Sequence, residues 1–412
     1  MPSVSQALGW VPHFLDRLDY NDNQRSAGIV GYQFEEDMAK NGFKVFDSDM
    51  HVLEPPDLWE RYLDETFRHR APQGSRNTPL DLGITVEETP GLKLSGQISR
   101  FAIQERGGIE RFAEDIERGF DAVAQLRAMD REGIDVTVLY PSRGLYVNSY
   151  PDMDPDFSLA ISQAYNNWLA DFCQAGDPKR MYGAAMLPVH DIDAAIGEAQ
   201  RAVTELGFKA VFLRPNPPRP GLYWHQSCFD PLWEAVQRLG VPVGFHEGVA
   251  SHMPTVGADR FGHAEFTLQH ACSHSMEQML ALEAMTLGGV LERFPHLKVA
   301  FLEGNGSWLP FWLWRLDEHW ENPGRYENPS LKLKPSAYFY RQCFVSVECG
   351  EWPACQAVES CGADFFVFST DYPHYDTQYP DATSRFLELP FSEESKQKIL
   401  WDNCARLYNI AI

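Results

Sequence analysis

The sequence lacks the features that mark secreted and membrane-spanning proteins. None of its eight cysteines forms a Cys-x-x-Cys pair. No apolar run approaches the roughly 20 residues that a bilayer requires, and the N-terminus has no basic start followed by an apolar block. We therefore expect reduced, mostly structural thiols in a cytoplasmic protein without a membrane partner.

Positive charge is also scarce. Lys and Arg number 35 against 58 Asp and Glu, which gives a formal net charge of −23 and a pI near 4.9. Nucleic acids and anionic membranes are bound by surfaces with an excess of Lys and Arg. The charge balance therefore argues against both and leaves a small molecule as the expected partner.

Two common catalytic signatures are missing as well. The chain contains no Gly-x-Ser-x-Gly nucleophile elbow, which argues against Ser-His-Asp catalysis. No Gly-x-Gly-x-x-Gly or Gly-Lys-Ser follows a predicted strand, so we expect no phosphate-cradling loop.

What the sequence does contain is a regular alternation. Eight short runs rich in β-branched or aromatic residues occupy residues 44–46, 136–140, 182–186, 210–213, 241–245, 299–302, 344–347 and 365–368. Segments of helical period follow at 120–132, 157–175, 192–206, 229–239, 276–294, 308–320, 353–361 and 393–407, the last after a Ser392 N-cap. Eight βα units predict an α/β fold, a TIM-type (β/α)8 barrel.

Two segments fall outside this alternation. Residues 1–42 are polar and irregular, and we expect an N-terminal extension there, before a barrel over 43–412. Residues 64–118 fit neither period and are too long for an ordinary connection. This insertion after strand one is predicted to be a lid.

The residues that follow the strands can bind or ionise. In such barrels the side chains past the carboxyl ends of the strands converge on one face, where the chemistry lies. Within the first strand region Asp47, Asp49 and His51 alternate, so they share one side. Buried unpaired carboxylates are costly, and a divalent cation is the simplest partner for several of them. We therefore predict a metal site.

Four separated motifs carry a family resemblance. Phe-Asp-Ser-Asp49-Met-His51, Gly-Phe-His246-Glu-Gly, Phe-Leu-Glu303-Gly-Asn-Gly-Ser-Trp-Leu-Pro and Phe-Ser-Thr-Asp371-Tyr-Pro-His arrive in order at the right strands. Over residues 44–412 the chain resembles the amidohydrolase superfamily. The branch it is most similar to includes aminocarboxymuconate semialdehyde decarboxylase and the dihydroxybenzoate-type decarboxylases.

The resemblance implies a set of metal ligands. Asp49 and His51 match the first-strand positions of the family, and His246 and Asp371 match directly. Glu303 stands where many members have His. This carboxylate-rich set weakens a simple zinc-hydroxide mechanism and suits Mn²⁺ or iron, with Zn²⁺ still possible. One or two ions per chain are compatible with it.

Further residues are candidates for proton transfer and substrate binding. His270 and His274 are four residues apart and share a face if a helix has begun there. His274 is interpreted as a proton donor or as a ligand of a second metal, against the alternative of an ordinary helix histidine. The candidates for substrate binding, for which solvated ion pairs are an equal alternative, are Arg143, Arg214, Asn216 and His374.

These observations leave three functional hypotheses. The first is a metal-dependent hydrolase or nonoxidative C–C lyase, such as a decarboxylase, with Asp371 as general base. The alternative is a nonheme iron monooxygenase, with one or two irons, acting on a small organic or acyl-thioester substrate. The third is a binding subunit without catalysis. A homodimer is expected for any of them.

Overall fold

The computed structural model describes residues 40–78, 80–91, 108–249, 251–262 and 266–410. The predicted N-terminal extension lies almost entirely outside the described residues. The described part of the chain belongs to one compact unit that begins at Met38.

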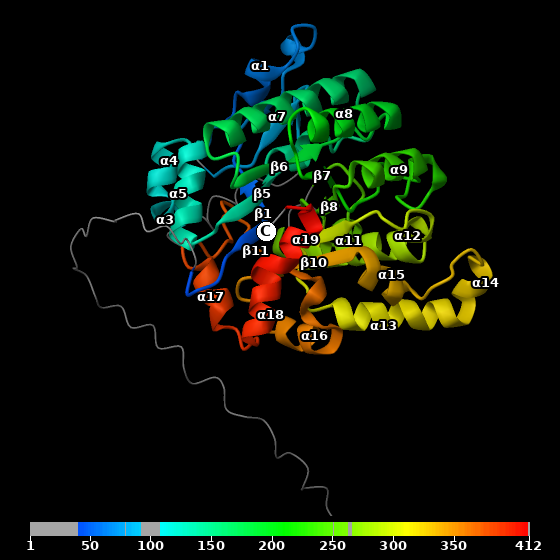
Figure 1. Cartoon of the computed structure of the whole chain (residues 1–412). Helices are drawn as coiled ribbons and strands as arrows, with labels where there is room; N and C mark the ends of the chain where they lie inside the picture. The colour runs from blue at the N-terminus through cyan, green and yellow to red at the C-terminus, as the bar shows by residue number, and fades with distance from the viewer. Residues whose placement is uncertain (1–39, 79, 92–107, 250, 263–265, 411–412) are drawn as a thin grey trace, which may run out of the picture. The chain divides into compact units, whose positions relative to one another are not determined.

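Eight parallel strands form the centre of this unit (Figure 1). They pair in chain order as β1 Phe46–Val52, β5 Val136–Pro141, β6 Met181–Met186, β7 Ala210–Leu213, β8 Val243–His246, β9 Val299–Leu302, β10 Cys343–Glu348 and β11 Phe366–Ser369. The amide of His51 donates to the carbonyl of Tyr372 at 2.7 Å, and the amide of Asp371 donates to the carbonyl of Asp49 at 3.3 Å. These bonds join the first strand to the end of the last, so the predicted barrel is confirmed.

Helices surround the strands (Figure 1). The longer ones are α5 Ala122–Glu132, α7 Pro155–Ala175, α8 Ile192–Thr204, α9 Asp230–Leu239, α11 Phe266–Thr286, α13 Leu309–His319, α15 Pro335–Gln342, α16 Ala354–Cys361 and α17 Ala382–Glu388. Short helices are α6 Gly144–Val147, α10 Ala258–Phe261, α12 Val290–Arg293, α14 Arg325–Glu327, α18 Glu393–Gln397 and α19 Asn403–Tyr408. Of the longer helices, α15 and α17 were not expected from the sequence.

The first strand is longer than its sequence suggested. It runs over Phe46–Val52 rather than ending at residue 46, and all seven residues are buried. Its register against β5 shifts between Asp47 and Met50. This irregularity breaks the strict alternation, and it lets Asp47 and Asp49 make different contacts.

Helix α11 begins ten residues earlier than its apolar pattern suggested. It starts at Phe266, so His270 and His274 lie within it, and it ends at Thr286. Gly289, with a φ of 82°, separates it from α12. The left-handed conformation is one that glycine adopts without steric cost, which explains the break inside the predicted 276–294 segment.

The last predicted helix contains a π-helical turn. Ser392 accepts a hydrogen bond from the amide of Ser395, which confirms the predicted cap. A π-helical turn, η5 Lys398–Asp402, then separates α18 from α19. The helical run predicted over 393–407 is therefore present over 393–408, with this π-helical turn inside it.

The insertion after β1 contains small elements of its own. A three-stranded antiparallel sheet is formed by β2 Gln73–Gly74, β3 Ile84–Val86 and β4 Thr89–Pro90. Short helices α1 Leu58–Tyr62, η1 Arg68–Arg70, α3 Gly108–Arg111 and α4 Ala113–Glu117 flank it.

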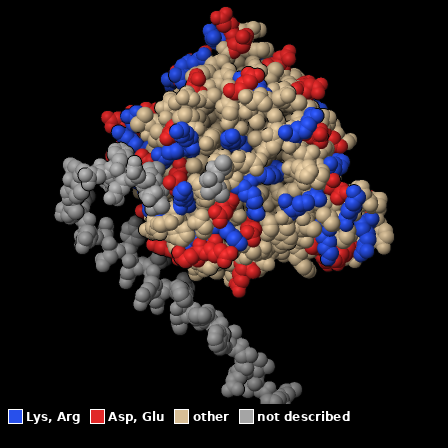
Figure 2. All heavy atoms as spheres, in the orientation of Figure 1, with Lys and Arg blue, Asp and Glu red and all other residues tan. Residues whose placement is uncertain are grey.

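The surface carries mixed charges. Figure 2 shows Lys and Arg interspersed with Asp and Glu over the visible face, without a continuous basic area. Among the described helices, none combines the length and apolar character needed to cross a bilayer.

Buried amides tie the outer helices to the barrel. The side-chain amide of Asn403, in α19, donates to the carbonyls of Ala363 and Phe366, each at 2.7 Å. Asn403 is almost fully buried. Because β11 begins at Phe366, this amide fixes the entry of the strand that leads to Asp371.

Replacing Asn403 by Ala should therefore destabilise the protein. Two buried carbonyls would lose their donor, at a cost of about 1–3 kcal/mol. The measurement is the urea concentration at half-unfolding, with the exposed Asn322→Ala as matched control. Equal midpoints for the two variants would contradict this assignment.

Candidate metal centre

Side chains from four strands meet at the carboxyl end of the barrel. The Nε2 atom of His51 lies 3.2 Å from Asp371 Oδ1 and 3.6 Å from Asp49 Oδ1. The Nε2 atom of His246 lies 3.0 Å from Glu303 Oε2 and 3.5 Å from Asp49 Oδ2. Ligand atoms of His51, His246, Glu303 and Asp371 all lie within 4.8 Å of one another. The five predicted ligands are therefore brought together.

The two imidazoles are oriented for ligation. His51 Nδ1 lies 2.9 Å from the carbonyl of Pro141, and His246 Nδ1 lies 2.8 Å from the carbonyl of Glu247. A carbonyl only accepts, so Nδ1 carries the proton and Nε2 keeps its lone pair. Donation of the outer nitrogen to a carbonyl is the usual arrangement of metal-bound histidine.

Asp49 shows why a cation fits this group. Both of its carboxylate oxygens are buried, and neither has a hydrogen-bond partner among the described residues. Burial, followed by the charges of Glu303 and Asp371, raises the pKa of Asp49 well above its usual value. A buried carboxylate without donors is costly, and a divalent ion removes that cost.

His51, beside Asp49, is also suited to bind a divalent ion. Burial, with His374 and His246 nearby, lowers the pKa of His51 to about 4. His51 is therefore neutral near pH 7, which is the form that binds a metal.

Asp47 makes hydrogen bonds beside the ligand group. It accepts hydrogen bonds from the amide of Asp49 at 3.0 Å and from the hydroxyl of Thr370. It is fully buried, and burial raises its pKa to about 7. The side chain thus links β1 to Thr370, the residue after β11, but does not enter the ligand group.

The backbone at two ligands adopts a conformation that is uncommon for residues with a side chain. Glu303 has a φ of 46° and Asp371 a φ of 58°. Such left-handed residues persist where the surroundings hold them, and they cluster at functional sites. At Glu303 the amide donates to the Ser346 hydroxyl at 3.1 Å, which helps to hold this turn.

His374 lies directly behind Asp371. Its Nδ1 atom is 2.7 Å from Asp371 Oδ1, its Nε2 atom is 2.9 Å from the Ser142 hydroxyl, and its ring stacks on His51 at 4.0 Å between centroids. Burial lowers the pKa of His374, but the Asp371 carboxylate outweighs it and the pKa rises to about 9. A protonated His374 can therefore donate a hydrogen bond from Nδ1 to the Asp371 carboxylate.

A second group of potential ligands shares Glu303. His274 Nε2 lies 3.6 Å from Glu303 Oε1, and the rings of His270 and His274 are 4.1 Å apart. Ligand atoms of His270, His274 and Glu303 also lie within 4.8 Å of one another. Burial lowers the pKa of His274, but the Glu303 charge outweighs it and the pKa rises to about 9. The sequence pattern assigned His270 no role of its own. The predicted helix began at residue 276, whereas α11 begins at Phe266 and includes His270.

Three predicted substrate-binding residues are engaged elsewhere. The guanidinium of Arg143 donates to the carbonyls of Glu54, Ser75 and Asp81. Arg214 donates to the carbonyls of Leu145 and Gly248 and to Asn216 Oδ1. None of Arg143, Arg214 and Asn216 belongs to either ligand group.

The Glu54 side chain makes buried hydrogen bonds to a neighbouring loop. Its carboxylate accepts from the amides of Ser142, Arg143 and Gly144 and is fully buried. It therefore connects the loop after β1 to the loop after β5.

The ligand group opens into a pocket of about 190 Å³. Its lining includes four carboxyl side chains, and among the described lining residues none is Lys or Arg. Burial raises the pKa of Glu348 to about 8 and that of Asp376 to about 7. Glu348 follows the seventh strand in the sequence, whereas Asp376 gave no signal there because it lies inside a loop.

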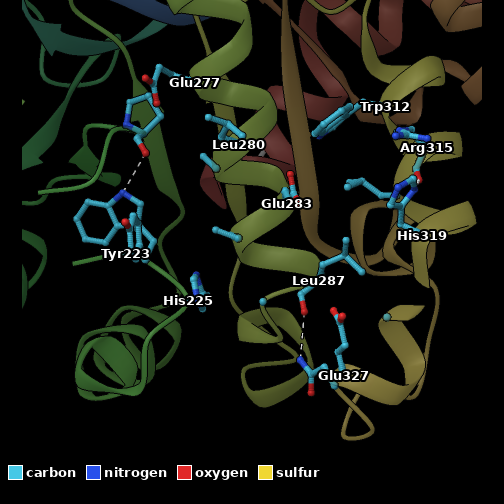
Figure 3. Close-up of a pocket in the computed structure, with 18 of the residues that line it drawn as sticks. Tyr223, His225, Glu277, Leu280, Glu283, Leu287, Trp312, Arg315, His319 and Glu327 are labelled. Carbon is cyan, nitrogen blue, oxygen red and sulfur yellow. Dashed lines mark hydrogen bonds between the residues drawn. The ribbon is translucent and has the colours of Figure 1, made fainter. Parts of the chain in front are cut away.

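A larger hollow of about 670 Å³ lies elsewhere (Figure 3). Figure 3 shows Leu280 and Glu283 on α11, and Leu287 just after its end, opposite Arg315 and His319 of α13. None of the residues that line it belongs to the two ligand groups. Glu303 and Asp371 of the first ligand group, and all of the second group, instead line the smaller pocket.

Comparison with known proteins shows the family of this chain. The model of the Amidohydrolase family matches residues 46–410. A gamma-resorcylate decarboxylase of Polaromonas sp. (strain JS666 / ATCC BAA-500) is 28% identical over 304 residues, covering 69% of this chain and 86% of that protein. The 2-amino-3-carboxymuconate-6-semialdehyde decarboxylase of Dictyostelium discoideum is 26% identical over 294 residues, covering 69% and 75%.

A solved structure shares the fold. The 5-carboxyvanillate decarboxylase of Novosphingobium aromaticivorans DSM 12444, crystallised with manganese and 4-hydroxy-3-methoxy-5-nitrobenzoic acid, superposes with a TM-score of 0.67. The identity is 21%, and the match covers 92% of this chain and all of that one.

The support that Asp47 gives can be measured. Asp47→Asn should lower the affinity for a divalent metal by about 10–100-fold, as loss of a group that orients ligands does. Metal retained after dialysis against a graded series of chelators would be counted by elemental analysis. The control is Asp57→Asn, a surface residue paired with Arg61. Identical retention by both variants would show that Asp47 does not support the centre.

Proposed function

Because this chain belongs to the amidohydrolase family, we propose that it is a metal-dependent decarboxylase of a small carboxylated aromatic molecule. The observation that carries the proposal is the convergence of Asp49, His51, His246, Glu303 and Asp371 at the mouth of the barrel. The relatives named above are decarboxylases, which favours C–C cleavage over hydrolysis.

The ligand set favours a particular class of ion. Three carboxylates and two imidazoles form an oxygen-rich set, which suits Mn²⁺ or Fe²⁺ better than a hydroxide-forming Zn²⁺. We propose Mn²⁺, the ion bound in the solved 5-carboxyvanillate decarboxylase. When bound, it supplies electrophilic polarisation of a substrate oxygen.

The proton for the product comes from Asp371 and His374. Decarboxylation breaks the bond between the ring carbon and the carboxylate, CO2 leaves, and the electron pair that stays on carbon takes up one proton. His374 Nδ1 lies 2.7 Å from Asp371 Oδ1, and its other nitrogen contacts Ser142. Asp371 lines the pocket, so it can pass a proton from His374 to the substrate.

The monooxygenase alternative gains no support. The relatives named above carry decarboxylase names. The carboxylate-rich ligand set, which suggested iron, is accounted for equally well by Mn²⁺.

We propose that segment 64–118 acts as a lid, since its described part contacts the loops at the barrel mouth. Arg111 donates to the carbonyls of Tyr375, Thr377 and Tyr379, in the loop that carries Asp371. The carbonyl of Pro90 lies 2.8 Å from His252 Nε2 in the loop after β8.

Cellular location and assembly complete the proposal. All eight cysteines are free, as expected in the reducing cytoplasm.

Phe311 and Trp314 of α13 are 57% and 60% exposed, and Leu280 of α11 is 47% exposed. Large exposed apolar side chains on neighbouring helices favour a homodimer through this face.

Turnover tests the proposed reaction. The manganese-loaded protein should release CO2 from at least one of gamma-resorcylate, 5-carboxyvanillate and related hydroxylated benzoates. Asp371→Asn should lower the rate by about 10²–10⁴-fold because it removes the acid–base group, while Asp57→Asn keeps the wild-type rate. CO2 release is measured directly. No release from any aromatic carboxylate would overturn the substrate class, and full activity of Asp371→Asn would overturn the role of that residue.

Assembly is tested by light scattering. The wild-type protein should have the mass of a dimer, and Trp314→Glu should shift it to the monomer because a charge would be buried in the interface. Val123 of α5, which is 40% exposed, provides the control Val123→Glu, since α5 and α13 lie on opposite sides of the barrel (Figure 1). A monomeric wild-type protein, or dissociation by the control alone, would refute the face proposed here.

A further inference from the structure

The residues beside the first ligand group suggest a second site. Glu303 has two carboxylate oxygens that face different partners: Oε2 lies 3.0 Å from His246 Nε2, and Oε1 lies 3.6 Å from His274 Nε2. One carboxylate thus belongs to both groups of potential ligands. A carboxylate in this position is able to bridge two cations.

The two histidines are held in place by the helix that carries them. His270 and His274 are one helical turn apart on α11, and their rings lie 4.1 Å apart. One turn further on, the Gln278 amide donates to the carbonyls of Phe245 at 3.0 Å and Leu302 at 2.6 Å. These carbonyls immediately precede His246 and Glu303, so α11 is fixed against the strands that carry the shared carboxylate.

The close approach of α11 to the barrel requires a glycine. A Cβ atom at Gly304 would lie 2.6 Å from Gln278 Cγ and 3.3 Å from the carbonyl of His274. Without a side chain at residue 304, the helix packs near enough for His274 to reach Glu303.

Charge in the pocket also favours a second cation. Glu303, Glu348, Asp371 and Asp376 line it, and Asp49 lies beneath. Among the described lining residues there is no Lys or Arg to offset these groups. A second cation among these carboxyl groups would also offer a positive partner to a carboxylate substrate.

We propose that His270, His274 and Glu303 form a second divalent-cation site, joined to the first by the shared Glu303 carboxylate. Each imidazole binds through a nitrogen lone pair. All three side chains line the pocket, so the remaining coordination positions face the space where a substrate enters. A cation at this site can bind the carboxylate of an anionic substrate. This role in substrate binding rests on the proposed decarboxylase function, but the existence of the site does not.

The interpretation of His274 as a proton donor is the competing one. It leaves His270 without a role, although His270 lies in the same group and lines the same pocket. Two histidines and an acid within 4.8 Å are more than a single proton donor needs.

Metal counting decides between the two. The full chain is stripped with chelator and titrated with Mn²⁺ alone in equilibrium dialysis, and bound manganese is counted per chain by elemental analysis. We expect about two ions per chain in the wild-type protein and about one in the double variant His270→Ala/His274→Ala. The matched control is His69→Ala/His296→Ala, which removes two exposed histidines and should keep the wild-type count.

A count of about one in the wild-type protein overturns the proposal, as does an unchanged count in the His270→Ala/His274→Ala variant. If that variant does not fold, the wild-type count decides, together with electron paramagnetic resonance of the manganese-loaded protein. An exchange-coupled spectrum supports the shared carboxylate, and the spectrum of isolated Mn²⁺ contradicts it. None of these readouts depends on turnover, so failure of the decarboxylase proposal would be seen separately, as an absence of CO2 release.

Discussion

The structure depends on the burial of carboxylates that the protein itself does not satisfy. Asp49 is fully enclosed, yet its oxygens face the Nε2 atoms of His51 and His246 rather than any donor. Removing a charge from water costs several kcal/mol unless it is paired. A cation bound between these side chains would offset the free-energy cost of burying the carboxylate. The surrounding strands and loops position the candidate ligands for such an ion.

Several contacts of the barrel lie around Asp49. The bonds between β1 and β11 close the barrel where Asp49 and Asp371 face each other. Asp47 fixes the same junction from below, and His374 fixes Asp371 from behind. These contacts therefore join strands from opposite ends of the sequence beside the candidate ligands.

The sequence predicted the barrel because its strands and helices have local patterns, whereas the five candidate ligands followed from the resemblance to the amidohydrolase superfamily. Runs of β-branched residues mark strands, and polar residues directly after them mark the functional face. It did not predict which polar residues face the pocket. Arg143 and Arg214 follow strands yet donate to carbonyls of neighbouring loops, and Asp376 lies inside a loop yet lines the pocket. Loop conformation, which has no periodic signal, decides these cases. His270 was undervalued because the apolar pattern of α11 is weak at its start.

The central claim is that these carboxylates enclose a cation, and the most direct measurement is a crystal structure of manganese-soaked protein with anomalous scattering recorded near the manganese edge. The account predicts an anomalous peak enclosed by Asp49, His51, His246, Glu303 and Asp371, at coordination distances of about 2.0–2.3 Å. A map without a peak among these five side chains, at full manganese loading, would contradict it.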